Sequence, residues 1–256
     1  MAVPDWSFVR RPRWIVGHVV AIAAIVVFIV LGMWQLNRLA ERRDLNSLVT
    51  ARMDMEVARL DSLTSRYGFF EGLEFRRTFV TGRYMAEHEV MYLLVSRNGQ
   101  SGHVLLTPLQ LETGQVVLIE RGWVPADSEG PPVPGAEPPS GDVTVTGMFL
   151  DPDDRRRSGG TLDLETRRIT TFDRQRLDDA IPGELLPMIL RLEDQKPDHD
   201  GPPARMPGPV ITEGPHLGYA VQWFLFAGVV VVSYPVLLFR TARSRNAGRS
   251  ADVASA

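Results

Sequence analysis

The segment that opens with His216 combines an imidazole with two aromatic rings. Spacings of three and seven residues place His216, Tyr219 and Trp223 on one face of a helix. A neutral histidine can ligate haem iron or another metal ion, and aromatic rings beneath it can pack against a flat macrocycle. The same residues also fit a polar group above an aromatic belt at a membrane surface, and physical chemistry alone favours that simpler interpretation.

A second group of residues that could bind a ligand lies near the other end of the chain, in Gly32–Arg38, which reads GMWQLNR. Trp34 suits the interface between membrane and water. Arg38 is long enough to extend its guanidinium into water. The alternative to a ligand-binding group is an aromatic belt residue followed by a solvated arginine.

The third group lies between the other two, in a predicted hairpin. Thr107-Pro108-Leu109 in one strand is followed by Arg121-Gly122-Trp123-Val124-Pro125 at the end of the next. These residue types fit a strand end where a bulge or tight turn exposes a guanidinium beside an indole, which is typical of partner-binding surfaces. The equally supported alternative buries Trp123 in the core and leaves Arg121 at the surface.

Sequence signatures of enzymes are absent. There is no G-x-S-x-G, no H-E-x-x-H, no P-loop and no dinucleotide-binding glycine triplet. The acidic segments Asp151–Asp154 and Asp198–Gly201 complete no calcium loop, and we expect solvated turns there. The chain has no cysteine, which excludes disulfides, thiolate metal sites and a cysteine nucleophile. We therefore expect a protein that is not an enzyme.

One other histidine, His18, lies in an apolar run, at the end of that run far from Trp34. His18 and His216 are then separated by most of a bilayer, so one haem cannot use both. If His216 is an axial ligand, the second axial position is open, filled by a partner protein, or taken from His88 or His103.

Two apolar runs must position these groups. Trp14–Leu36 and Leu217–Phe239 each contain 23 residues without a formal charge, and a helix of that length spans roughly 34 Å. A cleaved signal peptide is the alternative for the first run, but the run is too long and no A-x-A-like site follows it. We therefore expect transmembrane helices over residues 14–36 and 217–239.

Basic residues indicate the orientation of these helices. By the positive-inside rule, residues 1–13 and 240–256 are expected in the cytoplasm and residues 37–216 outside it. The second helix decides this, because arginines also follow the first. The arginines near the chain ends are Arg10, Arg11, Arg13, Arg240, Arg243, Arg245 and Arg249. One lysine beside 27 arginines hints at a bacterial genome, so we expect a multi-pass protein of a bacterial plasma membrane.

Residues 37–216 predict an α+β domain with mainly antiparallel strands. A helix continues from Arg38 toward Leu60, another is expected near Asp173–Ala180, and Asp127–Gly141 and Lys196–Pro215 look irregular. Turn residues after the second and third strands favour hairpins. The expected strands are Phe75–Tyr84, Val90–Ser96, Val104–Leu111, Val116–Val124, Val143–Phe149 and Met188–Leu192.

The charge of this domain excludes one class of partner. Residues 39–215 contain 20 arginines and lysines against 29 aspartates and glutamates. An acidic domain repels the phosphate backbone, so we expect no nucleic acid as a partner.

Taken together, these segments resemble the Surfeit locus protein 1 family of cytochrome c oxidase assembly factors. The family shows Gly-x-Trp-Gln-x-x-Arg at the end of its first helix, Thr-Pro-Leu followed by Arg-Gly-Trp-Val-Pro, and His-Leu-x-Tyr-Ala-x-x-Trp at the start of its second. All three motifs occur here in that order, at Gly32–Arg38, Thr107–Pro125 and His216–Trp223. The resemblance covers both apolar runs and the domain between them to about Leu150, whereas Asp151–Pro215 shows few family residues.

The resemblance implies a non-catalytic factor that helps to insert haem a into the large subunit of a haem-copper oxidase. His216 would be the ligand of a transiently bound haem iron, and Arg38 would pair with the haem propionates. Trp34, Gln35, Tyr219 and Trp223 would complete the cofactor site. The implied partners are the large subunit of cytochrome c oxidase, haem a synthase and membrane lipid.

A membrane-anchored scaffold is the alternative, in which Arg121, Gly122 and Trp123 bind an oxidase subunit and no haem is carried. The sequence does not separate the two functions. A third class, a sensor that signals inward, is weaker because the chain ends show no folded pattern.

Overall fold

The computed structural model describes residues 6–67, 72–152 and 159–254. The chain divides into two compact units. The helix unit combines Met1–Ser47 with Ile211–Ala256, and the sheet unit comprises Leu48–Val210.

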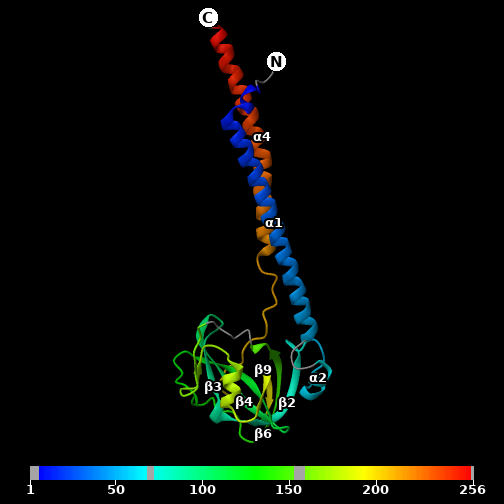
Figure 1. Ribbon diagram of the computed structural model, residues 1–256, viewed down its shortest axis with the longest axis vertical. Helices are drawn as coiled ribbons and strands as arrows, with labels where there is room; N and C mark the ends of the chain where they lie inside the picture. The colour runs from blue at the N-terminus through cyan, green and yellow to red at the C-terminus, as the bar shows by residue number, and fades with distance from the viewer. Residues whose placement is uncertain (1–5, 68–71, 153–158, 255–256) are drawn as a thin grey trace. The chain divides into compact units, whose positions relative to one another are not determined.

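Two long helices form the helix unit. Helix α1 spans Pro12–Met53 and α4 spans His216–Ala254, and a short 3-10 helix, η1 (Ser7–Arg10), precedes α1. The last six residues of α1, from Leu48, belong to the sheet unit. The two helices run antiparallel and side by side (Figure 1). The 23-residue runs identified in the sequence lie inside these longer helices, because charged residues that favour helices extend both of them.

Small residues allow α1 and α4 to approach each other closely. A Cβ atom on Gly32 would lie 2.7 Å from the ring of Phe224, and one on Gly17 would lie 3.3 Å from the hydroxyl of Tyr234. Ala220 is almost fully buried in the same pair. Helices in lipid gain little from burying apolar side chains, because lipid is itself apolar. They associate through close van der Waals packing instead, which small residues allow.

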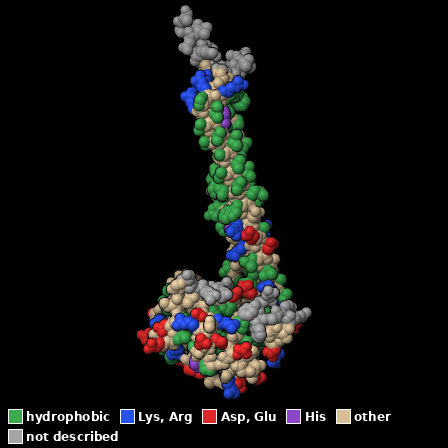
Figure 2. Space-filling view, viewed as in Figure 1, with side chains coloured by type: hydrophobic (Ala, Val, Ile, Leu, Met, Phe, Trp, Pro, Cys, Tyr) green, Lys and Arg blue, Asp and Glu red, His purple; other side chains and the backbone are tan. Residues whose placement is uncertain are grey.

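The outer surface of the helix pair is apolar. Figure 2 shows hydrophobic side chains along the pair and basic side chains close to the chain ends. Aliphatic side chains at least half exposed include Ile15, Val16, Val19, Val20, Ile22, Val26, Leu225, Val229 and Val232. An exposed apolar surface of this extent is unsuited to water. Both helices are long and apolar enough to cross a membrane, and the pair fits a membrane anchor.

In its described residues, the sheet unit contains nine strands and two short α-helices. The helices are α2 (Leu60–Tyr67) and α3 (Arg174–Ala180), and a 3-10 turn, η2, spans Ala86–His88. The strands are β1 (Ala58–Arg59), β2 (Arg77–Tyr84), β3 (Val90–Arg97), β4 (Gln100–Leu111), β5 (Gln115–Pro125), β6 (Asp142–Leu150), β7 (Leu162–Asp163), β8 (Arg168–Ile169) and β9 (Glu184–Lys196).

Five of the strands close into a barrel. The order of the sheet is β1-β2-β6-β9-β5-β4-β3-β8-β7, and β4 also pairs with β2 through Gly82–Tyr84. The ring therefore runs β2-β6-β9-β5-β4 and back to β2, which leaves none of these five strands as a free edge along this stretch. Strands β3, β8 and β7 extend the sheet outward from β4.

The expectation of a mainly antiparallel sheet is wrong, because the sheet is mixed. Strand β9 runs parallel to β5, β8 parallel to β3, and β1 parallel to β2. The long segment between Pro125 and Glu184 carries the chain back to the start of β5, so β9 enters in the same direction. Alternating hydrophobicity reports which face of a strand is buried and does not report the direction of its partner.

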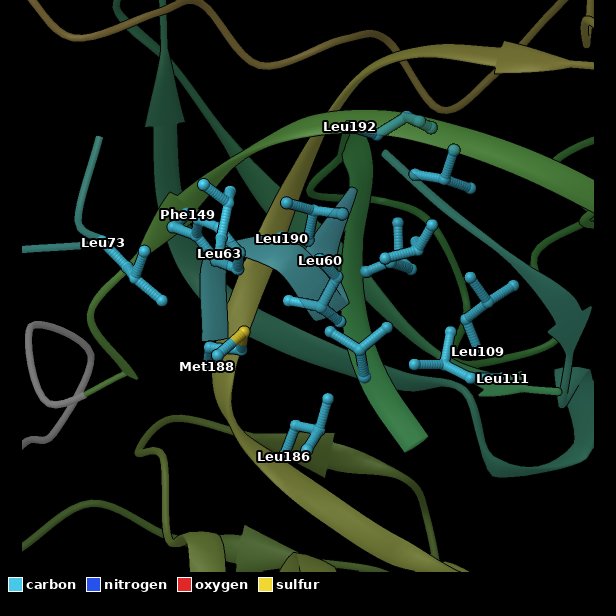
Figure 3. Close-up of a cluster of buried hydrophobic side chains, with 14 of the residues drawn as sticks. Leu60, Leu63, Leu73, Leu109, Leu111, Phe149, Leu186, Met188, Leu190 and Leu192 are labelled. Carbon is cyan, nitrogen blue, oxygen red and sulfur yellow. The ribbon is translucent and has the colours of Figure 1, made fainter. Parts of the chain in front are cut away.

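Apolar side chains from all five barrel strands form one core. In Figure 3, Leu109, Leu190 and Leu192 from the strands converge with Leu60 and Leu63 of α2. A second cluster packs α3 against the other face of β4 and β5. Both faces of β5 are thus buried, which explains why Val116–Ile119 is a continuous apolar run in the sequence.

The predicted local elements are largely confirmed. Asn98 and Gly99, with φ of 51° and 80°, form the β3–β4 turn, and Gly114, with φ of 86°, lies in the β4–β5 turn. The predicted helix is α3, whose N-cap Asp173 accepts a hydrogen bond from the backbone N–H of Arg176. These features depend on local turn and capping chemistry, which the sequence states directly.

Candidate functional site

His216 is the first residue of α4, and its ring contacts α1. The Nδ1 atom of His216 lies 2.9 Å from the Oε1 atom of Gln35. Pro215 precedes the helix and its carbonyl accepts the first helical hydrogen bond, from Tyr219. The antiparallel packing of α1 and α4 therefore brings together two residues that are 181 positions apart in the sequence.

This contact determines which ring nitrogen of His216 remains for a ligand. When Gln35 presents its carbonyl oxygen, Nδ1 carries the proton and donates it, and Nε2 keeps its lone pair. Histidines that bind metals commonly donate their other N–H in this way, which fixes the tautomer and the orientation of the ring. The arrangement is thus suited to a metal or haem ligand at Nε2.

Gly214 leaves room beside this nitrogen. It has φ of +69°, and a Cβ atom at this position would lie 3.6 Å from Nε2 and 3.4 Å from Cδ2 of His216. Gly214 therefore allows the left-handed turn before α4, and a Cβ atom there would be in ordinary van der Waals contact with the imidazole.

The aromatic residues of the predicted cofactor site divide into two kinds. Trp223 stacks on Phe28 of α1, with ring centroids 5.7 Å apart and an angle of 26°, and meets Phe226 edge to face. Its indole is thus engaged in packing the two helices. Tyr219 and Trp34 are each 49% exposed, so their rings remain accessible to a flat ligand.

Arg38 lies one helical turn beyond Trp34 and is exposed. Its guanidinium lies 5.7 Å from the centroid of the Trp34 ring and forms a 2.8 Å ion pair with Glu41. An exposed ion pair of this kind contributes about 0–1 kcal/mol. Arg38 can therefore exchange Glu41 for another carboxylate at little cost.

His18 differs from His216 in having both ring nitrogens engaged. The hydroxyl of Tyr234 lies 2.6 Å from Nδ1, and the carbonyl of Val9 lies 3.2 Å from Nε2. The two rings meet edge to face. His18 thus acts as a polar clamp between the helices. Sequence reasoning missed Tyr234, although a tyrosine inside an apolar run is itself a signal of a polar partner.

The expected exposure of Arg121 is wrong, because its side chain is 1% exposed. The predicted bulge exists: Leu105 pairs with Gly122 and Leu106 with Glu120, so Arg121 is the extra residue. The bulge turns Arg121 inward, where its Nη1 atom lies 2.9 Å from the carboxylate of Glu89.

Buried partners hold the Arg121 guanidinium in place. Its Nη1 atom also donates to the carbonyl of Ala136 at 2.7 Å, and Thr107 donates to the same Glu89 oxygen at 2.5 Å. The Tyr84 ring lies 5.6 Å from the guanidinium. Glu89 was missed in the sequence because nothing near it marks a buried carboxylate.

Gly122 and Trp123 lie beside this buried pair. A Cβ atom on Gly122 would lie 2.6 Å from the carbonyl of Ala204, so only glycine fits there. Trp123 is 8% exposed, and its indole N–H donates to the carbonyl of Val95 at 3.3 Å. Partner binding through Arg121, Gly122 and Trp123 stays a prediction, and the exposure on which it was based is not observed.

The other candidate ligands of the sequence have contacts within the sheet unit. The Nε2 atom of His88 lies 3.9 Å from the carboxylate of Glu87, and that of His103 lies 3.2 Å from the carbonyl of Ala126. In the acidic segment Asp198–Gly201, the Nε2 atom of His199 lies 2.9 Å from the carbonyl of Pro202. Asp153 and Asp154 lie outside the described residues. Within the described part of the chain, no three His, Asp or Glu side chains gather in a way that could hold a metal ion.

The sequence is similar to known proteins of one family. The sequence model of the SURF1 family matches residues 22–228, a range that contains both Gln35 and His216. An uncharacterised SURF1-like protein of Mycobacterium tuberculosis is 23% identical over 248 residues, which cover 95% of this chain and 90% of that protein.

Two eukaryotic relatives match shorter parts of the chain. The cytochrome oxidase assembly protein SHY1 of Saccharomyces cerevisiae is 29% identical over 107 residues, 41% of this chain and 27% of that protein. A SURF1-like protein of Caenorhabditis elegans is 28% identical over 153 residues, 52% of this chain and 47% of that protein. Because the family match spans most of the sequence, including both residues of the His216–Gln35 contact, the chain belongs to the SURF1 family.

Proposed function

We propose that this chain is an assembly factor of a haem-copper cytochrome c oxidase, which carries haem a transiently and helps to insert it into the large subunit. It performs no chemical turnover of its own. The observation that carries the proposal is the His216–Gln35 hydrogen bond, which leaves Nε2 available. The yeast relative, a cytochrome oxidase assembly protein, supports the general role in assembly.

The residues present fit a haem. His216 would ligate the iron through Nε2, and the exposed rings of Trp34 and Tyr219 offer apolar faces to a macrocycle. Arg38 would leave Glu41 and pair with a propionate, which is a stronger interaction when it is bidentate. The haem supplies redox chemistry only in the finished oxidase, so the task of this chain is to bind, orient and release it.

The proposed topology places this site at the outer surface of a bacterial plasma membrane. Helices α1 and α4 would both cross the membrane, with both chain ends in the cytoplasm and the sheet unit outside. The apolar surface of the helix pair supports contact with membrane lipid. The large oxidase subunit would receive the haem, and haem a synthase is the proposed donor.

Oxidase assembly in cells tests this function. Cells that lack the chain are complemented with the wild type, with His216→Ala, and with His18→Ala as a matched control in the same helix pair. Haem a in the oxidase is measured from the absorbance of the membranes. We expect His216→Ala to lose most of the oxidase-bound haem a and His18→Ala to retain it.

Full assembly with His216→Ala, at normal expression, would contradict haem delivery through this residue. That result would favour the scaffold, which binds an oxidase subunit and carries no haem. Loss of haem a in the His18→Ala control as well would show that the helix pair as a whole is required, so His216 would have no special role.

A further inference from the structure

A second interaction joins α1 to the segment that precedes His216. The guanidinium of Arg43 forms two hydrogen bonds with Glu213, from Nε to Oε1 at 2.8 Å and from Nη2 to Oε2 at 2.9 Å. Both side chains are about half exposed. The two parallel bonds fix the direction of the carboxylate as well as its distance, which a single contact would not do.

Only two residues separate this ion pair from His216. Both residues, Gly214 and Pro215, are conformationally restricted. Gly214 has φ of +69°, and its backbone N–H lies 3.2 Å from the hydroxyl of Thr212. The ring of Pro215 restricts its own φ. Three residues span at most about 11 Å, so the position of the Glu213 carboxylate limits where the start of α4 can lie.

The Arg43–Glu213 pair and the His216–Gln35 contact thus lie on either side of one short turn. Each joins this turn or the start of α4 to the same helix. If Glu213 is released, Thr212–Pro215 can swing away from α1, and the imidazole loses the constraint on its approach to Gln35. With Glu213 held, the ring has one orientation in which Nδ1 meets Gln35.

We propose that Arg43 and Glu213 form a latch that positions the imidazole of His216. The latch touches no haem itself. It holds the Thr212–Pro215 turn against α1, and so keeps Nδ1 of His216 on Gln35 and Nε2 free. The inference rests on the proposed function for its use, although the position of the ring can be measured without any haem.

The ionisation of Glu213 agrees with this role. The hydrogen bond and charge of Arg43 lower the pKa of the Glu213 carboxyl below its ordinary value. The carboxylate is therefore charged throughout the neutral pH range, and the latch stays closed there.

Charge reversal tests the latch. Full-length wild type, Arg43→Glu, Glu213→Arg and the double variant R43E/E213R are purified in detergent with 15N-labelled histidine. Arg42→Glu is the matched control, because it reverses the same charge at the neighbouring exposed position. His216→Ala assigns the resonance. The first readout is the tautomer of the His216 ring by 15N NMR, and the second is the amount of bound haem.

We expect the wild type, Arg42→Glu and the double variant to show one His216 tautomer with the proton on Nδ1. Each single reversal should give a mixture of tautomers and several-fold less bound haem. Single reversals that match Arg42→Glu in the NMR spectrum would overturn the latch, and so would a double variant that does not restore the tautomer. Absence of haem from the wild type would refute the proposed function, and the NMR result would still decide the latch.

Discussion

The two histidines of the helix unit have the same side chain and different uses. His18 has both ring nitrogens occupied, by Tyr234 and Val9, whereas Nδ1 of His216 meets Gln35 and Nε2 lies beside Gly214. A free lone pair is what a metal requires. The sequence identified His216 by its aromatic neighbours, but the orienting contact with Gln35 follows only from the antiparallel packing of the helices.

Replacing Gln35 tests this contact at the scale of a single residue. Gln35→Leu removes the acceptor and keeps the volume, so the His216 ring loses its preferred tautomer and orientation. Loss of an orienting partner of this kind weakens metal binding by roughly 10- to 100-fold. Titration of purified protein with haem measures the loss. Gln35→Glu restores an acceptor and should bind close to the wild type. Equal affinity of all three proteins would contradict the role of Gln35.

The buried ion pair of Arg121 and Glu89 leads to a prediction about the stability of the sheet unit. Arg121→Ala leaves the Glu89 carboxylate buried without its cation, and breaking such a pair costs about 3–5 kcal/mol. R121M/E89L removes both charges and should cost less. Chemical unfolding of the full chain, followed by circular dichroism, measures both. A larger loss in the double variant would show that the pair itself stabilises the fold.

The burial of Tyr84 predicts that the stability of the folded state depends on pH. Burial raises the pKa of its hydroxyl well above the ordinary value, and the hydroxyl donates to Gln195 at 3.0 Å. The folded state therefore favours the neutral form of the Tyr84 hydroxyl. The contribution of this hydroxyl to stability is complete below the ordinary tyrosine pKa of about 10, and it is lost as the pH rises above that value.

Ultraviolet absorbance of phenolate during alkaline titration checks this prediction. Wild type and Tyr84→Phe should gain the same absorbance until the protein unfolds, because Tyr84 does not ionise before then. An additional tyrosine that titrates near its ordinary pKa in the wild type would contradict the burial of this hydroxyl.

At the scale of elements, the helix pair depends on close approach. Gly32→Val would place a branched side chain where even a Cβ atom lies 2.7 Å from the ring of Phe224. Overpacking of this kind costs typically 1–3 kcal/mol, and it should separate the helices near Gln35. We expect a lower thermal midpoint and weaker haem binding. Gly218→Val is the control, because a Cβ atom there meets nothing within 4 Å. Equal effects of the two would contradict close packing at Gly32.

Most elements of the sheet unit could be predicted from the sequence, but their arrangement could not. Turn residues such as Asn98 and Gly99 determine the β3–β4 hairpin locally. The parallel pairing of β9 with β5 depends on the path of a long connection, which leaves no periodic signal. The inward turn of Arg121 has the same origin, since a bulge in a strand is predictable from sequence but its direction depends on the partner strands.

At the scale of the whole molecule, composition separates the two units. The helix unit has the apolar surface of a membrane anchor, and the sheet unit has its own closed barrel and core. The residues that we assign to haem lie in the helix unit, at the start of α4 and in the middle of α1. The SURF1 family match, over residues 22–228, includes parts of both units.

One absorption spectrum can show whether the chain carries haem at His216. Wild type and His216→Ala are purified in detergent from cells that make haem a, and their spectra are recorded side by side. We expect a Soret band in the wild type that His216→Ala loses. A band of equal strength in both proteins would contradict ligation by His216, and no band in either would contradict haem carriage altogether.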